Sequence, residues 1–93
     1  MTYLCFYDLT VEPGKEQNLV ESLKRSKVDI GIYSPYLKSF RASIVSPGIV
    51  QVKAELTSEE AVPKLGGYLK AQKHVENISI HTTFFYPPGV FYF

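Results

Sequence analysis

Apolar and polar residues alternate along several stretches of the chain, a pattern that predicts strands with two different faces. Residues 2–11, 36–45 and 49–56 all show it, and residues 78–86 are predicted to form a last strand. The Ser-Pro-Gly linker at 46–48 combines a fixed φ with a residue that tolerates positive φ. The second and third strands are therefore predicted to form an antiparallel hairpin.

A helical period follows the first strand. Leu19, Val20 and Leu23 fall on one face of an amphipathic helix, with charged residues on the others. Pro13 suits a first helical turn, where the missing N–H costs nothing. We expect this helix to end near Lys27.

A second helix is predicted after the third strand. Thr57 and Glu60 have the spacing of a capping box. Pro63 and the Gly66-Gly67 pair weaken the segment, because each glycine costs about 1 kcal/mol relative to alanine in a helix interior. We therefore expect a kink or two short pieces. The predicted buried face comprises Ala61, Val62, Leu65, Tyr68 and Leu69.

The element order is then β-α-β-β-α-β, which predicts a ferredoxin-like α+β sandwich: a four-stranded antiparallel sheet with two helices on one face. We assign residues 1–86 to this single domain and residues 87–93 to an aromatic C-terminal tail. The tail carries three aromatics, which we expect to dock on the chain's own sheet or on a partner's.

Composition limits the classes of function. The 93 residues carry a net charge of +1, so no bulk field favours nucleic acid or an anionic membrane. No apolar run approaches the ~20 residues of a membrane span, and no leader pattern is present, so we expect a cytoplasmic protein. Cys5, the single cysteine, is interpreted as a small buried side chain. We predict no metal site and no cofactor.

The sheet face opposite the helices is the first place to look for function. If Val50 and Val52 point to the helices, the other face receives a mixture of aromatic and charged groups. We interpret it as a half-polar homodimer interface; a ligand or catalytic site and nucleic-acid binding are the alternatives. The predicted members are Leu4, Phe6, Asp8, Arg41, Lys53, Glu55, His81, Thr83 and Phe85.

Two histidines offer possible chemistry. His81 is expected to lie near Asp8, where a carboxylate could orient the imidazole for acid–base catalysis. We favour the simpler interpretation, a surface ion pair. His74 is interpreted as a cation near the negative end of the second helix, with ligand binding as the alternative.

Residues 7–16, with Val-Glu-Pro-Gly-Lys-Glu after an apolar strand, resemble the start of the dimeric α/β-barrel proteins. That group includes antibiotic-biosynthesis-type monooxygenases and the ligand-sensing modules of Lrp/AsnC regulators. The resemblance implies sheet-to-sheet pairing, and for the monooxygenases a cavity between helices and sheet. Tyr7, Tyr68 and His74 could line such a cavity, but the Trp usual in that branch is absent.

Residues 3–10 also resemble the first strand of the small CRISPR-associated ferredoxin-fold nucleases. The resemblance implies that Asp8 is a metal ligand. The Arg-rich start of the first helix in that family is missing here, and a single carboxylate does not make the oxygen-rich site that magnesium needs.

Our interpretation of the sequence is a small dimeric ligand-binding or interaction module without clear catalytic apparatus. The first alternative is a cofactor-independent enzyme with its pocket at Tyr7, Tyr68 and His74. The second is a metal-dependent nuclease that uses Asp8. For the open face we single out Phe6, Asp8, Arg41, Lys53 and His81, and we predict a homodimer, with a small-molecule ligand as a further partner and no role for nucleic acid or membrane.

Overall fold

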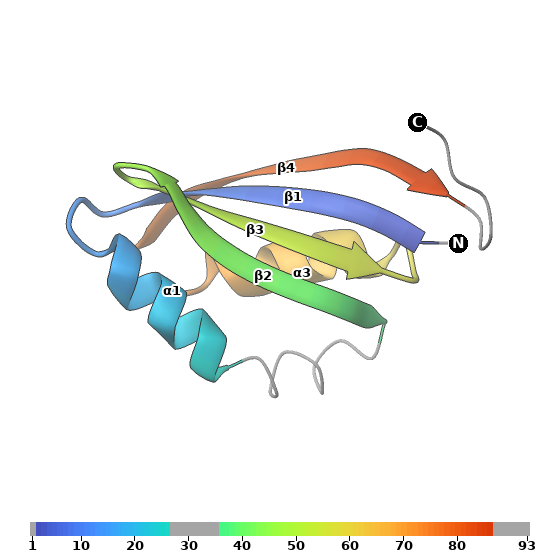
Figure 1. Cartoon of the computed structure of the whole chain (residues 1–93), viewed down its shortest axis with the longest axis horizontal. Coiled ribbons are helices and arrows are strands. Elements are labelled where there is room, and N and C mark those ends of the chain that lie inside the picture. The colour runs from blue at the N-terminus through green and yellow to red at the C-terminus, as the bar shows by residue number, and fades with distance from the viewer. Residues whose placement is uncertain (1, 27–35, 87–93) are drawn as a thin grey trace.

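The computed structural model describes residues 2–26 and 36–86, and the side-chain environment of residues 3–26 and 36–81. Its elements follow the predicted order (Figure 1). They are β1 (Thr2–Val11), α1 (Glu16–Arg25), β2 (Leu37–Ser46), β3 (Ile49–Leu56), α3 (Ala61–Lys70) and β4 (Val75–Tyr86).

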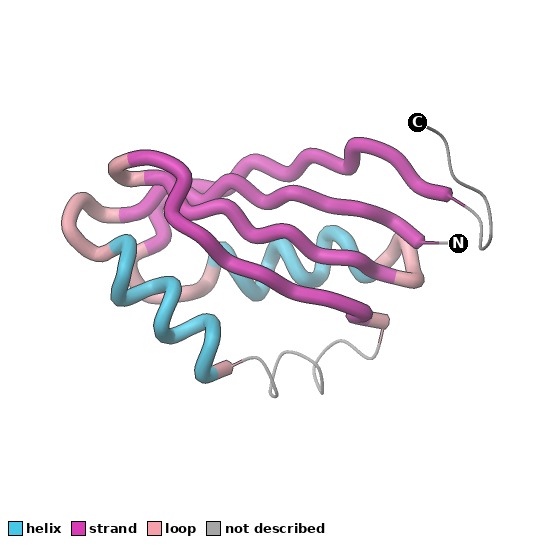
Figure 2. The backbone as a smooth tube through the Cα atoms, viewed as in Figure 1, coloured by secondary structure: helices cyan, strands magenta, loops and turns pink. Residues whose placement is uncertain are grey.

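The four strands form one antiparallel sheet in the order β2-β3-β1-β4, so β1 and β3 are central and β2 and β4 are the edges (Figure 2). The predicted hairpin is present: β2 pairs with β3 through a tight turn in which Gly48 has a φ of 80°. This order and the two helices confirm the ferredoxin-like α+β sandwich.

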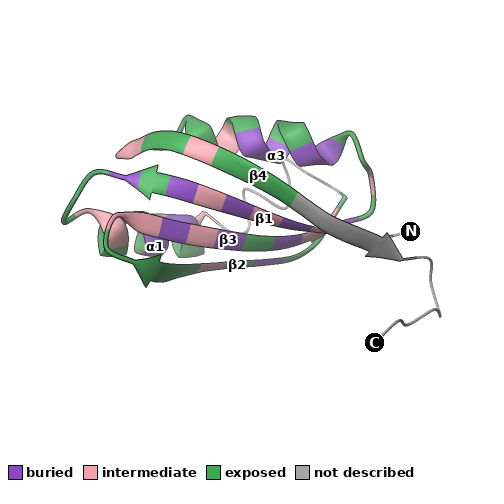
Figure 3. Ribbon diagram, turned by 90° about the horizontal axis from the view of Figure 1, so that it is seen from above, coloured by how far each residue is buried: buried purple, intermediate pink, exposed green. Residues whose placement is uncertain are grey.

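Both helices pack on the same face of the sheet and enclose the core between the two layers (Figure 3). The odd-numbered residues of β1 from Cys5 to Val11 and the even-numbered residues of β3 are buried there. They meet Leu19, Val20 and Leu23 of α1 and Leu65 and Leu69 of α3. The alternation read from the sequence therefore separates a core face from an open face, and Cys5 is buried as expected.

Helix α1 begins later than predicted. Pro13 and Gly14 form a turn instead of a first helical turn, with Gly14 at a φ of 86°, and the helix starts at Glu16. The prediction placed Pro13 inside the helix; the left-handed Gly14 that follows it ends any helical path there.

Helix α3 differs from the prediction in two respects. Thr57 does not cap it; the Thr57 N–H and hydroxyl both donate to the carbonyl of Tyr36, and the N-cap position is held by Glu60 without a side-chain bond. The segment is also not divided into two short pieces, since residues 61–70 form one helix. Pro63 lies in the first turn, where its missing N–H has no intrahelical partner to lose.

Strand β4 begins at Val75, three residues before the predicted start. The aromatic tail at 87–93 lies outside the described residues, as do the side chains of Thr83 and Phe85. Within the described part of the chain, neither helix is long and apolar enough to cross a membrane.

Candidate functional site

The open face of the sheet is arranged in rows, because residues that pair across antiparallel strands share a face. Phe6 of β1 lies between Lys53 of β3 and His81 of β4, and Arg41 of β2 lies beyond Lys53. One row therefore crosses all four strands. This row unites four of the five residues that the sequence analysis singled out on this face.

Asp8, the fifth, is the centre of a polar network in the next row. Its Oδ1 accepts a hydrogen bond from the Gln51 side-chain amide at 3.0 Å, and its Oδ2 lies 3.4 Å from Nε2 of His81. The two side chains of this second pair are 34% and 52% exposed, so the contact is an open one. The structure thus places Asp8 and His81 together, as the order of strands indicated.

The Ser79 hydroxyl also belongs to this network, and its position argues against a catalytic relay. The Ser79 hydroxyl lies 3.3 Å from Nε2 of His81, the same nitrogen that faces Asp8. In a nucleophile–imidazole–carboxylate relay the two ring nitrogens hold separate partners. The arrangement therefore fits a polar surface network better than a relay.

Two cations oppose each other on this face. Arg41 and Lys53 are direct partners across β2 and β3, both are exposed, and neither forms an ion pair with any described residue. Like charges directly opposite each other destabilise a sheet. Acidic groups lie on the same face at Asp8 and Glu55, so the face carries both signs of charge.

The three residues predicted to line a cavity between helices and sheet make different contacts in the structure. Tyr7 has no exposed surface, and its hydroxyl donates to the Val62 carbonyl at 2.9 Å. Burial, and then the neighbouring Cys5, raises the pKa of the Tyr7 hydroxyl, which keeps it a neutral donor. Tyr68 is partly buried and packs against the core.

His74 lies beyond the end of α3, in the connection to β4, and has a φ of 76°. Its Nδ1 is 2.9 Å from Oε2 of Glu12, and its carbonyl accepts the Glu12 N–H at 2.9 Å. This pairing could not be predicted, because the left-handed backbone of His74 is not encoded by the residues next to it. The described contacts of His74 join two loops.

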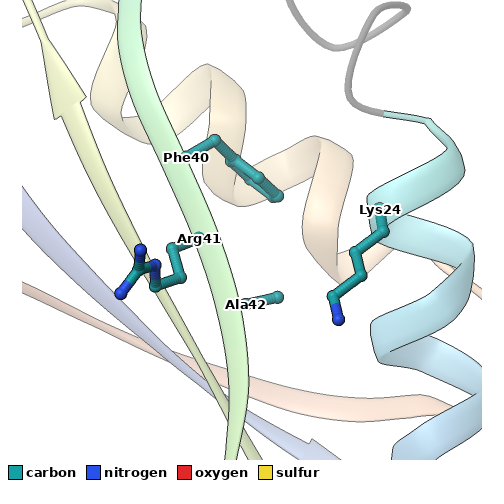
Figure 4. A pocket seen from close by; sticks show the side chains of 4 residues that line it. All are labelled: Lys24, Phe40, Arg41 and Ala42. Atoms are coloured by element: carbon teal, nitrogen blue, oxygen red, sulfur yellow. The ribbon is translucent and has the colours of Figure 1, made fainter.

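A cavity beside β2 was not predicted from the sequence. A cavity of about 210 Å³ lies between α1 and β2, lined by Lys24, Phe40, Arg41 and Ala42 (Figure 4). Phe40 and Ala42 point to the helix side of β2, while Arg41 points the other way. The signal in the sequence was the small Ala42 between two larger apolar residues, Phe40 and Ile44.

Among the described residues, no three His, Cys, Asp or Glu side chains are grouped so that they could hold a metal ion. Comparison with protein-family models, with curated proteins and with solved structures finds no match to this chain. Function must therefore be argued from the geometry.

Proposed function

We propose that the protein is a homodimeric interaction module that pairs through the open face of its sheet. One observation carries the proposal. Phe6 and Leu4 lie on central strand β1, on the face that neither helix covers, with charges of both signs around them. An apolar centre with a polar rim is the usual anatomy of an interface.

The charges of this face support pairing with a second copy. A two-fold axis brings the same patch of both subunits together, so a self-complementary interface needs both signs of charge. Arg41 and Lys53 would then meet Asp8 or Glu55 of the other copy, which would relieve their mutual repulsion. This arrangement is the sheet-to-sheet pairing implied by the resemblance to dimeric α/β-barrel proteins, and membership of that group is part of the proposal.

We favour binding of a small molecule less than formation of a homodimer. The cavity beside β2 is smaller than the roughly 300–1,000 Å³ typical of ligand pockets. Tyr7 is enclosed in the core and has no surface to offer a ligand. The pocket enzyme and the Asp8 nuclease remain untested hypotheses, and no contact of the described residues favours either.

The test is the molecular mass of Phe6→Glu in solution. The substitution places a carboxylate in the apolar centre of the proposed interface, where removing a charge from water is costly even beside the Lys53 cation. We expect a folded monomer. The matched control is Asn18→Glu, which adds the same charge at an exposed position of α1 and should leave the mass unchanged.

Circular dichroism establishes that both variants are folded before their masses are compared. A Phe6→Glu variant that keeps the mass of a wild-type dimer would place the interface elsewhere. Lys53→Glu gives a second, milder perturbation on the same face, with the side chain exposed and with no described ion pair to lose.

A further inference from the structure

The outer edge of β2 has no strand partner among the described residues. β2 is the terminal strand of the sheet, and no other described strand pairs with its outer side. Every second residue of an edge strand directs its N–H and C=O groups outward. Ser43, Ile44, Val45 and Ser46 are all exposed, with Ile44 and Val45 at 44% and 52%.

The cavity between α1 and β2 adjoins this edge. Phe40 and Ala42 line it from the helix side of β2 (Figure 4). Ile44, which pairs with the buried Val50, continues the same face toward the turn. Its volume of about 210 Å³ is on the scale of side chains and below that of a typical ligand pocket. A strand added to β2 would direct alternate side chains toward this cavity.

The charged residues of β2 and of the cavity lining are all basic. β2 carries Lys38 and Arg41 and no acidic residue, and Lys24 of α1 extends over the cavity. Cations on an edge strand also protect a sheet against unwanted pairing. These cations discriminate between incoming strands, because they repel a basic strand and attract an acidic one.

We infer that the edge of β2 binds an extended acidic segment of another protein by strand addition. Apolar side chains of that segment enter the cavity over Phe40 and Ala42. Its alternate acidic side chains lie on the other face, beside Arg41, and Lys24 attracts an acidic group at the cavity rim. This second surface follows the edge of β2 and shares Arg41 with the open face, but the inference does not rest on the proposed homodimer.

The experiment measures fluorescence anisotropy with a short fluorescein-labelled peptide in which Glu and Val alternate. A peptide of equal length with Lys in place of Glu is the control ligand. Arg41→Glu, on the face that receives the Glu side chains, should weaken binding of the acidic peptide about fivefold. Lys64→Glu makes the same charge change at an exposed position of α3, away from the cavity, and should change affinity less than twofold.

A variant without charge change tests the cavity itself. Ala42→Leu fills the space that a peptide side chain would occupy and should weaken binding about fivefold. Failure of the acidic peptide to bind wild type would overturn the inference. Equal binding of the Lys peptide, or equal losses in Arg41→Glu and Lys64→Glu, would also overturn it. A lower mass of Ala42→Leu in solution would assign the edge to a second copy of the chain and also overturn it.

Discussion

His74 and Glu12, which are 62 residues apart, are joined twice: Nδ1 of His74 lies 2.9 Å from the Glu12 carboxylate, and the His74 carbonyl accepts the Glu12 N–H at 2.9 Å. The pair holds the loop after β1 against the loop before β4. Because the His74 backbone has a φ of 76°, its side chain and backbone contribute to stability in opposite directions.

Substitutions at His74 should separate these two contributions. His74→Ala loses the side-chain contact and keeps a Cβ on the left-handed backbone. His74→Gly loses the same contact and also removes the steric strain of the left-handed backbone. We expect His74→Gly to be about 1 kcal/mol more stable than His74→Ala. Chemical denaturation at one protein concentration measures the free energies of unfolding. Equal stability of the two variants would contradict the prediction, because strain relief would then not exceed the extra conformational entropy that glycine loses on folding.

The carboxylate of Glu16 should make stability depend on acid pH. The pKa of Glu16 is lowered from its ordinary value of 4.5, first by the hydrogen bond to its own backbone N–H and then by the bond from the Gly48 N–H at 3.0 Å. A lowered folded-state pKa means that this stability is present above pH 4.5 and is lost as the pH falls through the folded-state value.

Glu16→Gln should therefore lose less stability than wild type on acidification below pH 4.5. Thermal unfolding from pH 6 to pH 2.5 compares the two proteins. Glu21→Gln, at an exposed position of the same helix, is the control and should follow the wild type. Parallel curves for wild type and Glu16→Gln would mean that the bond to Gly48 contributes nothing.

Gly66 and Gly67 should respond differently to alanine. A Cβ at Gly67 meets nothing within 4 Å, so Gly67→Ala should stabilise the protein by about 1 kcal/mol through helix propensity. A Cβ at Gly66 would lie 2.7 Å from Cδ1 of Ile80 and must displace that side chain. Gly66→Ala should therefore gain less.

A double-mutant cycle checks this explanation. Ile80→Val removes the Cδ1 atom, so Gly66→Ala should be more favourable in the Ile80→Val background than in wild type. Gly67→Ala should be equally favourable in both backgrounds. Additive effects of Gly66→Ala and Ile80→Val would show that the two residues do not collide.

Removal of residues 88–93 should leave the dimer intact, because the proposed interface is formed by the described residues of the open face. A chain that ends at Pro87 is compared with the full chain by light scattering at several concentrations. Dissociation of the shortened chain would make the aromatic tail the assembly element.

Much of the fold could be predicted because side-chain parity on a strand is a local property. The alternation in β1 and β3 separated the buried Val50 and Val52 from the open-face Lys53, and the strand order placed Asp8 beside His81. Predictions from local patterns were wrong where a residue bonds to a partner that is distant in the sequence. Thr57 bonds to Tyr36 instead of capping α3.

The cavity beside β2 and the link between His74 and Glu12 could not be predicted for the same reason. Each depends on the tertiary placement of segments distant in sequence. The proximity of Asp8 and His81 also does not specify a function for the pair.

The central claim is that two copies pair through their open sheet faces, and the mass of the unmodified chain in solution tests it most directly. Light scattering over a range of concentrations should give twice the chain mass of 10.5 kDa, falling to the single-chain value in Phe6→Glu. A mass of 10.5 kDa at every concentration would contradict the account and leave Phe6, Asp8 and Arg41 as a surface exposed to solvent.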